Sequence, residues 1–340
     1  MRLLADFRIY TKIKKNILHM TKENHIGTML ITGNGFDLNL GMKTGYKDFF
    51  DLMESMGFWD RYKDNRLLSY IYEKGAKDCW YSFEEIIKDF AIKNSEHSNQ
   101  IINDCKTALT LLKDELCKFI GNARPIYGNY SAASKILCAL FGCDGSGAVA
   151  WNERIRNRYD DFTDRFYLPK FKFITFNYTD PSLWLMRIIK NFVAKPLVEN
   201  ISSMSERVYN IHGKLEENIV FGTDEDERIP RELLFLRKCH YLERNTKSRF
   251  YQDLCNSKRI VIFGHSVHGI DFEYYEKFFK DKNNTSDIYI LSYSKKSLNE
   301  IEKGLKQKGI MLPIKYIITN VYDTGFCNLC DIINKEQSNT

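Results

Sequence analysis

Short apolar runs separated by helical stretches dominate the second half of the chain. Such runs are typical of parallel strands that are buried on both faces of a sheet. The pattern predicts strands over 28–32, 171–176, 208–211, 219–221, 259–264, 288–293 and 314–319. It predicts helices from Pro181, across 231–255, 271–280 and 296–308, and at the C-terminal end. We therefore expect an α/β protein with a doubly wound, mostly parallel sheet.

About 140 residues separate the first predicted strand from the second, and their pattern is helical. Apolar residues recur there at helical spacing, at Ile101, Cys105, Ala108, Leu112, Leu116 and Phe119. Ser82 and Glu85 form a capping box ahead of another predicted helix. The chain is thus divided into a basic N-terminal extension (1–25), a sheet domain (26–43 and 166–340) and a large helical insertion (44–165).

The composition excludes several classes of protein. Apolar residues make up 44% of the 340 residues, and Gly and Pro are sparse at 19 and 6, which excludes disordered and collagen-like chains. No apolar run approaches the roughly 18 residues of a membrane span, so we expect no membrane partner. The nine cysteines form no repeating framework, which indicates a reducing, cytoplasmic compartment. The pair Cys327 and Cys330 lacks the further ligands of a zinc site, so we predict buried thiols and no metal.

The formal charge of +6 is concentrated at the N-terminus. Residues 1–20 carry five lysines and arginines against one aspartate, whereas basic and acidic residues are interleaved in the rest of the chain. We expect no nucleic-acid partner, because such a protein usually presents a concentrated basic face. The extension has no long apolar segment and no small-residue cleavage site, which argues against a secretory signal. It is either a surface extension, or Met20 is the natural start.

A glycine-containing turn follows the first predicted strand, with the residues Gly33, Asn34, Gly35, Phe36 and Asp37. Two glycines let the backbone approach a pyrophosphate, and the amino terminus of a helix supplies free N–H groups. The spacing departs from the dinucleotide fingerprint, because Leu38 stands where the third glycine belongs. The turn is a candidate phosphate-binding site, and a plain strand-to-helix turn is the alternative.

Two further strand ends offer polar side chains. Asn177 follows Thr175 at the end of the second strand, and its amide can donate and accept, which suits the orientation of a ribose hydroxyl or a water. Turn formation is the alternative for Asn177. His212 ends the third strand beside Gly213, and a histidine can take and return a proton near neutral pH. A satisfied structural histidine is the alternative for His212.

The remaining candidates lie in two more turns that we expect at the same edge of the sheet. One turn contains Gly222, and the other contains Gly264, His265 and Ser266 and is followed by Asp271. Asp271 has an ordinary explanation as the N-cap of the next helix. Ser266 is not predicted to be a triad nucleophile, because a Gly-x-Ser-x-Gly elbow is absent.

Taken in order, these motifs resemble the bacteriophage abortive-infection AbiH family over about residues 28–290. The resemblance depends on the Gly33–Leu38 turn, the Thr44–Phe49 segment, Trp80 with Phe83 and Glu84, Phe176–Thr179, His212 with Gly213, Phe221 with Gly222, and Gly264–Ser266 with Asp271. It implies an anti-phage, abortive-infection protein.

The AbiH family in turn resembles sirtuin-like NAD-consuming domains, which implies a Rossmann-like sheet and NAD as substrate. By this resemblance Gly33 and Gly35 cradle phosphates, Asn177 orients ribose and water, and His212 is the catalytic base. Asn34, Phe36, Asp37, Thr175, Gly222, Gly264, His265, Ser266 and Asp271 are assigned to nucleotide binding. Asn34 replaces the alanine usual in sirtuins, and the four-cysteine zinc module is missing. NAD hydrolysis to nicotinamide and ADP-ribose is therefore expected, and deacetylation is not.

Two other functions remain open from the sequence. One is a nucleotide-sensing module that binds NAD or a related nucleotide without cleaving it. The other is a nuclease, in which Asp37 and Asp224 would converge on a metal ion. A phage-derived trigger and a homo-oligomer are partners that the sequence leaves open.

Overall fold

The computed structural model describes residues 26–75, 83–94, 98–124, 171–179, 208–213, 219–224, 226–241, 246–269, 271–281, 283–292 and 294–318. Several sequence predictions lie outside these ranges. They are the basic extension with Met20, the capping residue Ser82, the helix from Pro181, the final helix and the Cys327–Cys330 pair.

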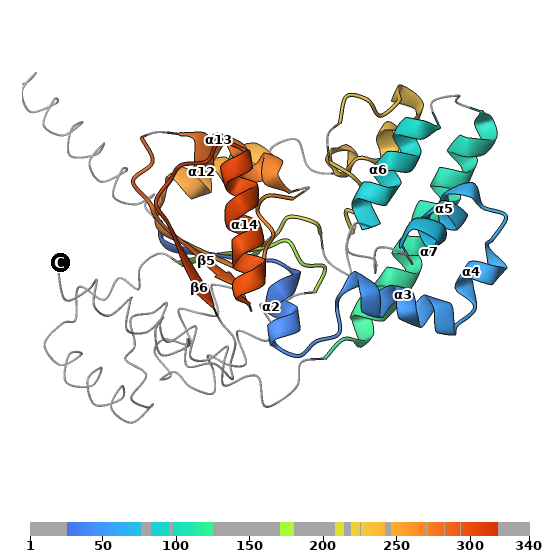
Figure 1. The fold of residues 1–340 in the computed structure, drawn as a ribbon, viewed down its shortest axis with the longest axis horizontal. Helices are drawn as coiled ribbons and strands as arrows, with labels where there is room; N and C mark the ends of the chain where they lie inside the picture. The colour runs from blue at the N-terminus through green and yellow to red at the C-terminus, as the bar shows by residue number, and fades with distance from the viewer. Residues whose placement is uncertain are drawn as a thin grey trace, which may run out of the picture.

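A six-stranded sheet forms one half of the described molecule (Figure 1). Its strands are β1 (Ile26–Thr32), β2 (Phe171–Thr175), β3 (Val208–Asn210), β4 (Ser257–Phe263), β5 (Asp287–Ser292) and β6 (Ile314–Ile318). Every neighbouring pair is parallel, and the strand order is β3-β2-β1-β4-β5-β6. The predicted α/β class with a parallel sheet is therefore confirmed. The chain moves outward from β1 in both directions, so the order reverses between β1 and β4.

Both faces of the central strands are buried, which explains their continuous apolar sequence. Met29 and Ile31 of β1 lie in one core, and Leu30, which points to the opposite face, is also fully buried. The first face is covered by α12 (Thr246–Cys255), α13 (Phe272–Lys280) and α14 (Lys295–Gln307). Ser294 caps α14 by accepting from the N–H of Ser297.

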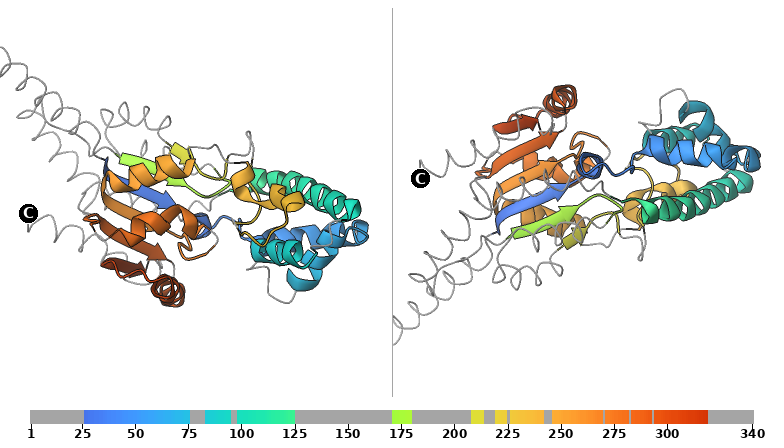
Figure 2. Two further views of the ribbon diagram at one scale, coloured as in Figure 1. Left: turned by 90° about the horizontal axis from the view of Figure 1, so that it is seen from above. Right: turned by 90° about the horizontal axis from the view of Figure 1, so that it is seen from below.

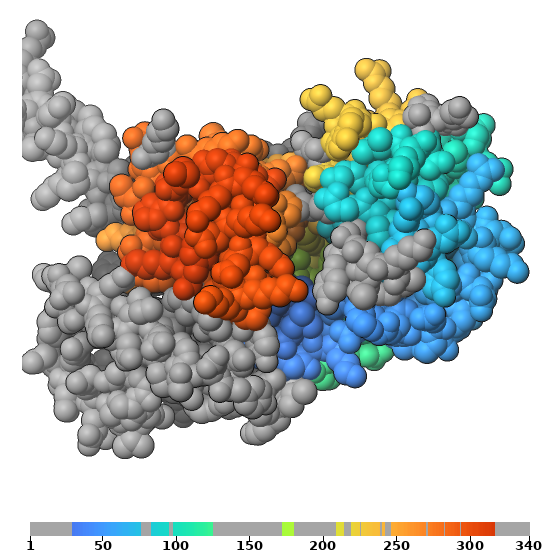
Figure 3. Space-filling view, viewed as in Figure 1, coloured from blue at the N-terminus to red at the C-terminus, as the bar shows by residue number. Residues whose placement is uncertain are grey.

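A separate group of helices, the helical layer, lies beyond the carboxyl ends of the strands (Figure 2). It contains α3 (Tyr46–Ser55), α4 (Phe58–Arg61), α5 (Arg66–Gly75), α6 (Phe83–Lys93) and α7 (Asn99–Asn122). The short helix α2 (Asn34–Asn39) joins β1 to this layer. In the space-filling view the sheet part and the helical layer adjoin as two distinct masses (Figure 3). None of the described helices is long and apolar enough to cross a membrane.

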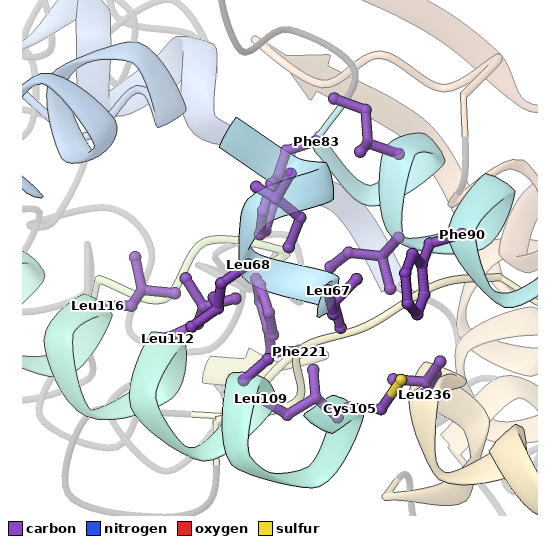
Figure 4. Packing of buried hydrophobic residues seen from close by; sticks show 14 of the residues in the cluster. Leu67, Leu68, Phe83, Phe90, Cys105, Leu109, Leu112, Leu116, Phe221 and Leu236 are labelled. Atoms are coloured by element: carbon purple, nitrogen blue, oxygen red, sulfur yellow. The ribbon is translucent and has the colours of Figure 1, made fainter. Parts of the chain in front are cut away.

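The apolar residues predicted at helical spacing between Ile101 and Phe119 lie on α7 and form part of the core of the helical layer (Figure 4). Cys105, Ala108, Leu112 and Leu116 of α7 are at most 2% exposed, and Phe119 packs against the same core while partly exposed. This core also takes in residues 219–236 from the second half of the chain. The helical layer therefore includes more of the sequence than the insertion alone.

Two predictions of secondary structure were wrong. Residues 219–221 form no strand, because Ile219 and Phe221 pack among the helices of the helical layer, where no neighbouring strand pairs with them. The helix expected over 231–255 is divided into two 3₁₀ helices, η3 (Arg231–Leu236) and η4 (Lys238–His240), followed by α12. Leu233 and Leu236 are both buried, and their three-residue spacing matches the three residues per turn of a 3₁₀ helix.

Candidate functional site

Buried polar side chains follow four adjacent strands, at the carboxyl edge of the sheet. Asn177 and His212 come two residues after β2 and β3, His265 comes two residues after β4, and Asp37 lies in α2 after β1. Their exposed fractions are 1–5%. Ligands bind to open parallel sheets at this edge, where the strand order reverses. The structure thus brings Asn177, His212, His265 and Asp37 to the carboxyl edge of the sheet.

The glycines of the first turn are required by the contact between two strand ends. A Cβ at Gly33 would lie 2.7 Å from Gly264 O, and one at Gly35 would lie 2.7 Å from Gly264 Cα. The Gly33 N–H donates to Phe263 O and the Gly35 N–H donates to Gly264 O, at 3.0 and 2.8 Å. These two donors, assigned to phosphates by the family resemblance, are thus used within the protein. The turn fixes the β1 and β4 ends against each other.

Asp37 is a fully buried carboxyl beside two polar residues of the loop after β2. Its Oδ2 accepts a 2.5 Å hydrogen bond from the Thr179 hydroxyl. Burial raises the pKa of Asp37 to about 7, against the lowering effects of Thr179 and of the nearby Asn177 amide. Asp37 Oδ1 and both polar atoms of the Asn177 amide form no well-aligned hydrogen bond with the described residues. Buried atoms of this kind indicate a water or a ligand.

The raised pKa of Asp37 predicts that stability falls as the pH rises. The folded protein keeps a proton on Asp37 that the unfolded chain releases near pH 4, so the contribution is complete below that pH and lost through pH 7. Between pH 5 and 8 the loss is roughly 3 kcal/mol. Asp37→Asn should abolish this difference in the free energy of unfolding, which is measured by urea unfolding at each of the two pH values. The exposed Asp60→Asn is the control, and equal pH dependence in all three proteins would contradict the prediction.

His212 is held by one ring nitrogen and has the other beside a carboxylate. Its Nδ1 lies 3.1 Å from the Phe176 carbonyl oxygen, to which an Nδ1–H donates. Its Nε2 is 3.2 Å from Asp271 Oδ1 but lacks a well-aligned hydrogen bond in the described part of the chain. Burial and the charge of Lys238 lower the pKa of His212, while Asp271 acts in the opposite direction. The lowered pKa favours the neutral imidazole, whose Nδ1–H donates to Phe176 O and whose Nε2 faces Asp271.

Asp271 does not act as a conventional helix cap. It occupies the N-cap position of α13, but among the described residues its side chain forms no capping hydrogen bond. Its carboxylate lies 3.1 Å from Lys238 Nζ, and its Oδ2 lies 3.4 Å from His265 Nε2. Burial raises the pKa of Asp271, but Lys238 and His212 overcome this effect and hold it well below its ordinary value. Asp271 is thus an ionised carboxylate between two histidines and a lysine.

Lys238 and Glu84 form a buried ion cluster with Asp271 and His212. The sequence did not identify Lys238 or Glu84 by its chemistry. Lys238 is 2% exposed and lies 3.0 Å from Glu84 Oε1. Glu84 belongs to α6, and its Oε1 accepts a 3.1 Å hydrogen bond from the Tyr46 hydroxyl. Glu84 stood only among the residues of the family resemblance. Lys238 lies in a segment of alternating charges with no motif, so no sequence signal pointed to it.

The other predicted residues near the glycine turn are mainly structural. Asn34 is exposed, and its side chain accepts a 2.7 Å hydrogen bond from the Thr44 hydroxyl. Phe36 packs edge-on against Phe263, with ring centroids 5.1 Å apart. Thr175 is fully buried, and its hydroxyl accepts from the N–H of Asn177, which fixes the start of the loop after β2.

Gly222 and Ser266 differ in their surroundings. A Cβ at Gly222 would lie 2.1 Å from Leu236 O, so the glycine admits the backbone that leads to Lys238. Ser266 is exposed, unlike its neighbour His265. Asp224, the partner of Asp37 in the nuclease alternative, pairs instead with Lys88 at 3.3 Å. Within the described ranges no group of three or more His, Cys, Asp and Glu residues is arranged to hold a metal ion.

The comparison with protein families agrees with the motifs at the strand ends. The model of the family described as "Bacteriophage abortive infection AbiH" matches residues 29–293, which include most of β1, the helical layer, the ion cluster and β5. No curated protein matches the chain significantly. Because the family model spans most of the sequence, the chain belongs to the bacteriophage abortive infection AbiH family.

Proposed function

We propose that this AbiH chain acts by binding NAD, or a closely related nucleotide, at the carboxyl edge of its sheet and hydrolysing the bond between ribose and nicotinamide. Family membership supplies the broad role, which is abortive infection directed against bacteriophage. The reaction and the nucleotide are inferences from the arrangement of the site.

The strand order supports a nucleotide as ligand. The order β3-β2-β1-β4-β5-β6 is that of the Rossmann-like, doubly wound sheet that binds dinucleotides where the order reverses. Gly33, Gly35 and Gly264 contribute to the proposed site by the close turn that they build between β1 and β4. The N–H groups of Gly33 and Gly35 are used in that turn and are not proposed to bind the ligand. Asn177 follows β2, which neighbours β1, and His212 follows β3, which neighbours β2.

The observation that carries the proposal is a set of buried polar atoms that form no well-aligned hydrogen bond in the described part of the chain. They include His212 Nε2 and both polar atoms of the Asn177 amide. A buried polar atom left without a hydrogen bond costs about 1–3 kcal/mol, so a fold retains several together only when something else satisfies them. A ribose hydroxyl and an attacking water would supply the missing donors and acceptors.

The reaction needs little from the protein beyond orientation and one base. As the bond from ribose C1′ to the nicotinamide nitrogen breaks, its electron pair moves to the ring, and the cationic nicotinamide leaves as a neutral molecule. Water forms the new C1′–O bond and gives its proton to His212 Nε2. Asn177 holds the ribose or the water. Phe176 O fixes the tautomer that leaves Nε2 free, and Asp271 stabilises the protonated ring.

The direct test is to incubate the purified full chain with NAD, with and without lysate from phage-infected cells. We expect nicotinamide and ADP-ribose to appear in equal amounts in at least one arm, and the same reaction with lysate alone is the control. If NAD is recovered intact in both arms, hydrolysis is refuted.

A second candidate is nucleotide sensing without cleavage. The observation that favours it is the depth of the site, since His212 and Asn177 are only 3% and 5% exposed. Calorimetry that shows NAD binding, with the ligand recovered unchanged, would favour sensing. Loss of a nucleic-acid-cleaving activity on addition of a chelator would instead favour the nuclease alternative.

A further inference from the structure

A continuous series of contacts connects the helical layer to His212. The Tyr46 hydroxyl lies 3.1 Å from Glu84, and Glu84 lies 3.0 Å from Lys238. Lys238 lies 3.1 Å from Asp271, and Asp271 lies 3.2 Å from His212. We propose that Lys238 and Glu84 are positioning residues of this site, through which the helical layer holds the Asp271–His212 pair in its working arrangement. The inference rests on the function proposed for His212.

Lys238 is fixed by its backbone as well as by its charge. Its N–H donates to Thr223 O at 2.8 Å, and the N–H of Thr223 donates to Leu236 O at 2.8 Å. Gly222 makes this approach possible, because any side chain there would meet Leu236 O. The ammonium group therefore reaches Asp271 from a rigid turn, while Glu84 reaches the ammonium from α6. Both carboxylates depend on one buried cation.

The charge of Lys238 has two consequences for the site. It keeps Asp271 ionised, and it opposes a second positive charge on His212. Glu84 balances part of this charge from the helical layer. The protonation of His212 therefore depends on the position of the helical layer, which carries Glu84. In the described part of the chain, the titratable groups in or facing this cluster are Tyr46, Glu84, Tyr178, His212, Lys238, His265, Asp271, Tyr274 and Tyr275.

The test is a pH titration of His212 in the full chain, observed by NMR with ¹³C-labelled histidine rings and assigned by loss of the signal in His212→Gln. In Lys238→Met the midpoint should rise by about one pH unit, because the opposing charge is removed. In Glu84→Gln the midpoint should fall, because Lys238 is then balanced by Asp271 alone. Lys238→Arg keeps the charge and should stay near the wild-type midpoint.

Lys88→Met is the matched control. Lys88 also connects α6 to the 219–224 segment, through Asp224, but it makes no contact with Asp271. Its loss should leave the midpoint of His212 unchanged. Equal midpoints in all variants, or an equal shift in Lys88→Met, would overturn the inference. If Lys238→Met does not fold, the comparison of Glu84→Gln with Lys88→Met decides.

A parallel measurement separates this inference from the proposed function. The acidic limb of the pH profile of nicotinamide release should move in the same direction as the midpoint of His212 in each variant. Opposite shifts for Lys238→Met and Glu84→Gln are not expected from a merely structural role. Opposite NMR shifts without any nicotinamide release would refute the NAD reaction and retain the electrostatic link.

Discussion

His212→Ala is expected to lower nicotinamide release by about 10²–10⁴-fold, the usual contribution of a general base. Burial and Lys238 lower the pKa of the imidazole, and the Phe176 carbonyl accepts from its Nδ1–H, which leaves Nε2, beside Asp271, as the proposed base. Alanine removes the base, but the strand ends and the glycine turn remain. The loss should therefore appear in kcat, measured by single-turnover release of nicotinamide with saturating NAD.

Two comparisons show whether this loss is specific to the site. His268→Ala removes another partly buried histidine, which packs against Gly304 of α14, and it should retain activity. Asn177→Ala should lower activity together with NAD affinity, because its amide is proposed to hold the ribose. Wild-type activity in both His212→Ala and Asn177→Ala would exclude these residues from the reaction.

Gly264→Ala should destabilise the protein by more than about 4 kcal/mol, a loss typical of severe packing defects. Gly264 has a φ of +64°, and its Cβ would lie 2.2 Å from Phe36 N and 2.3 Å from Gly35 C. These are backbone atoms of the turn after β1, so they cannot swing aside as a flexible side chain would. The substitution must separate the two strand ends that the site depends on.

Gly57→Ala is the matched control, because Gly57 has the same φ of +64° but nothing within 4 Å of a Cβ. It should cost only the backbone strain, about 1–2 kcal/mol. Urea unfolding of the two variants isolates the effect of the close contact from that of the backbone conformation. Equal losses of stability would show that the contact between the β1 and β4 turns contributes nothing.

The regular part of the fold was predictable because its elements bury whole faces. Residues 29–31 and 260–263 are continuously apolar, since both faces of their strands are covered. The helical spacing of residues 101–116 likewise matches the buried side of α7. The strand predicted over 219–221 was wrong, because three buried apolar residues have the same pattern in a strand and in an irregular segment packed among helices.

The site was only partly predictable. Asn177, His212 and Asp271 could be proposed from the sequence because each follows or precedes a recognisable element at the carboxyl edge. Lys238 was missed, because its burial depends on Gly222 and on contacts with Glu84, which lies 154 residues earlier in the chain. The glycine turn was interpreted as a phosphate site, but packing against Gly264 also requires glycine at those positions. A local pattern does not distinguish these two reasons.

The most direct measurement is a crystal structure of the full chain with ADP-ribose, the product of the proposed reaction. We expect the ligand at the carboxyl edge of β1, β2 and β3, with a ribose oxygen within hydrogen-bonding distance of the Asn177 amide and of His212 Nε2. ADP-ribose bound away from Asn177 and His212 would contradict the proposed site.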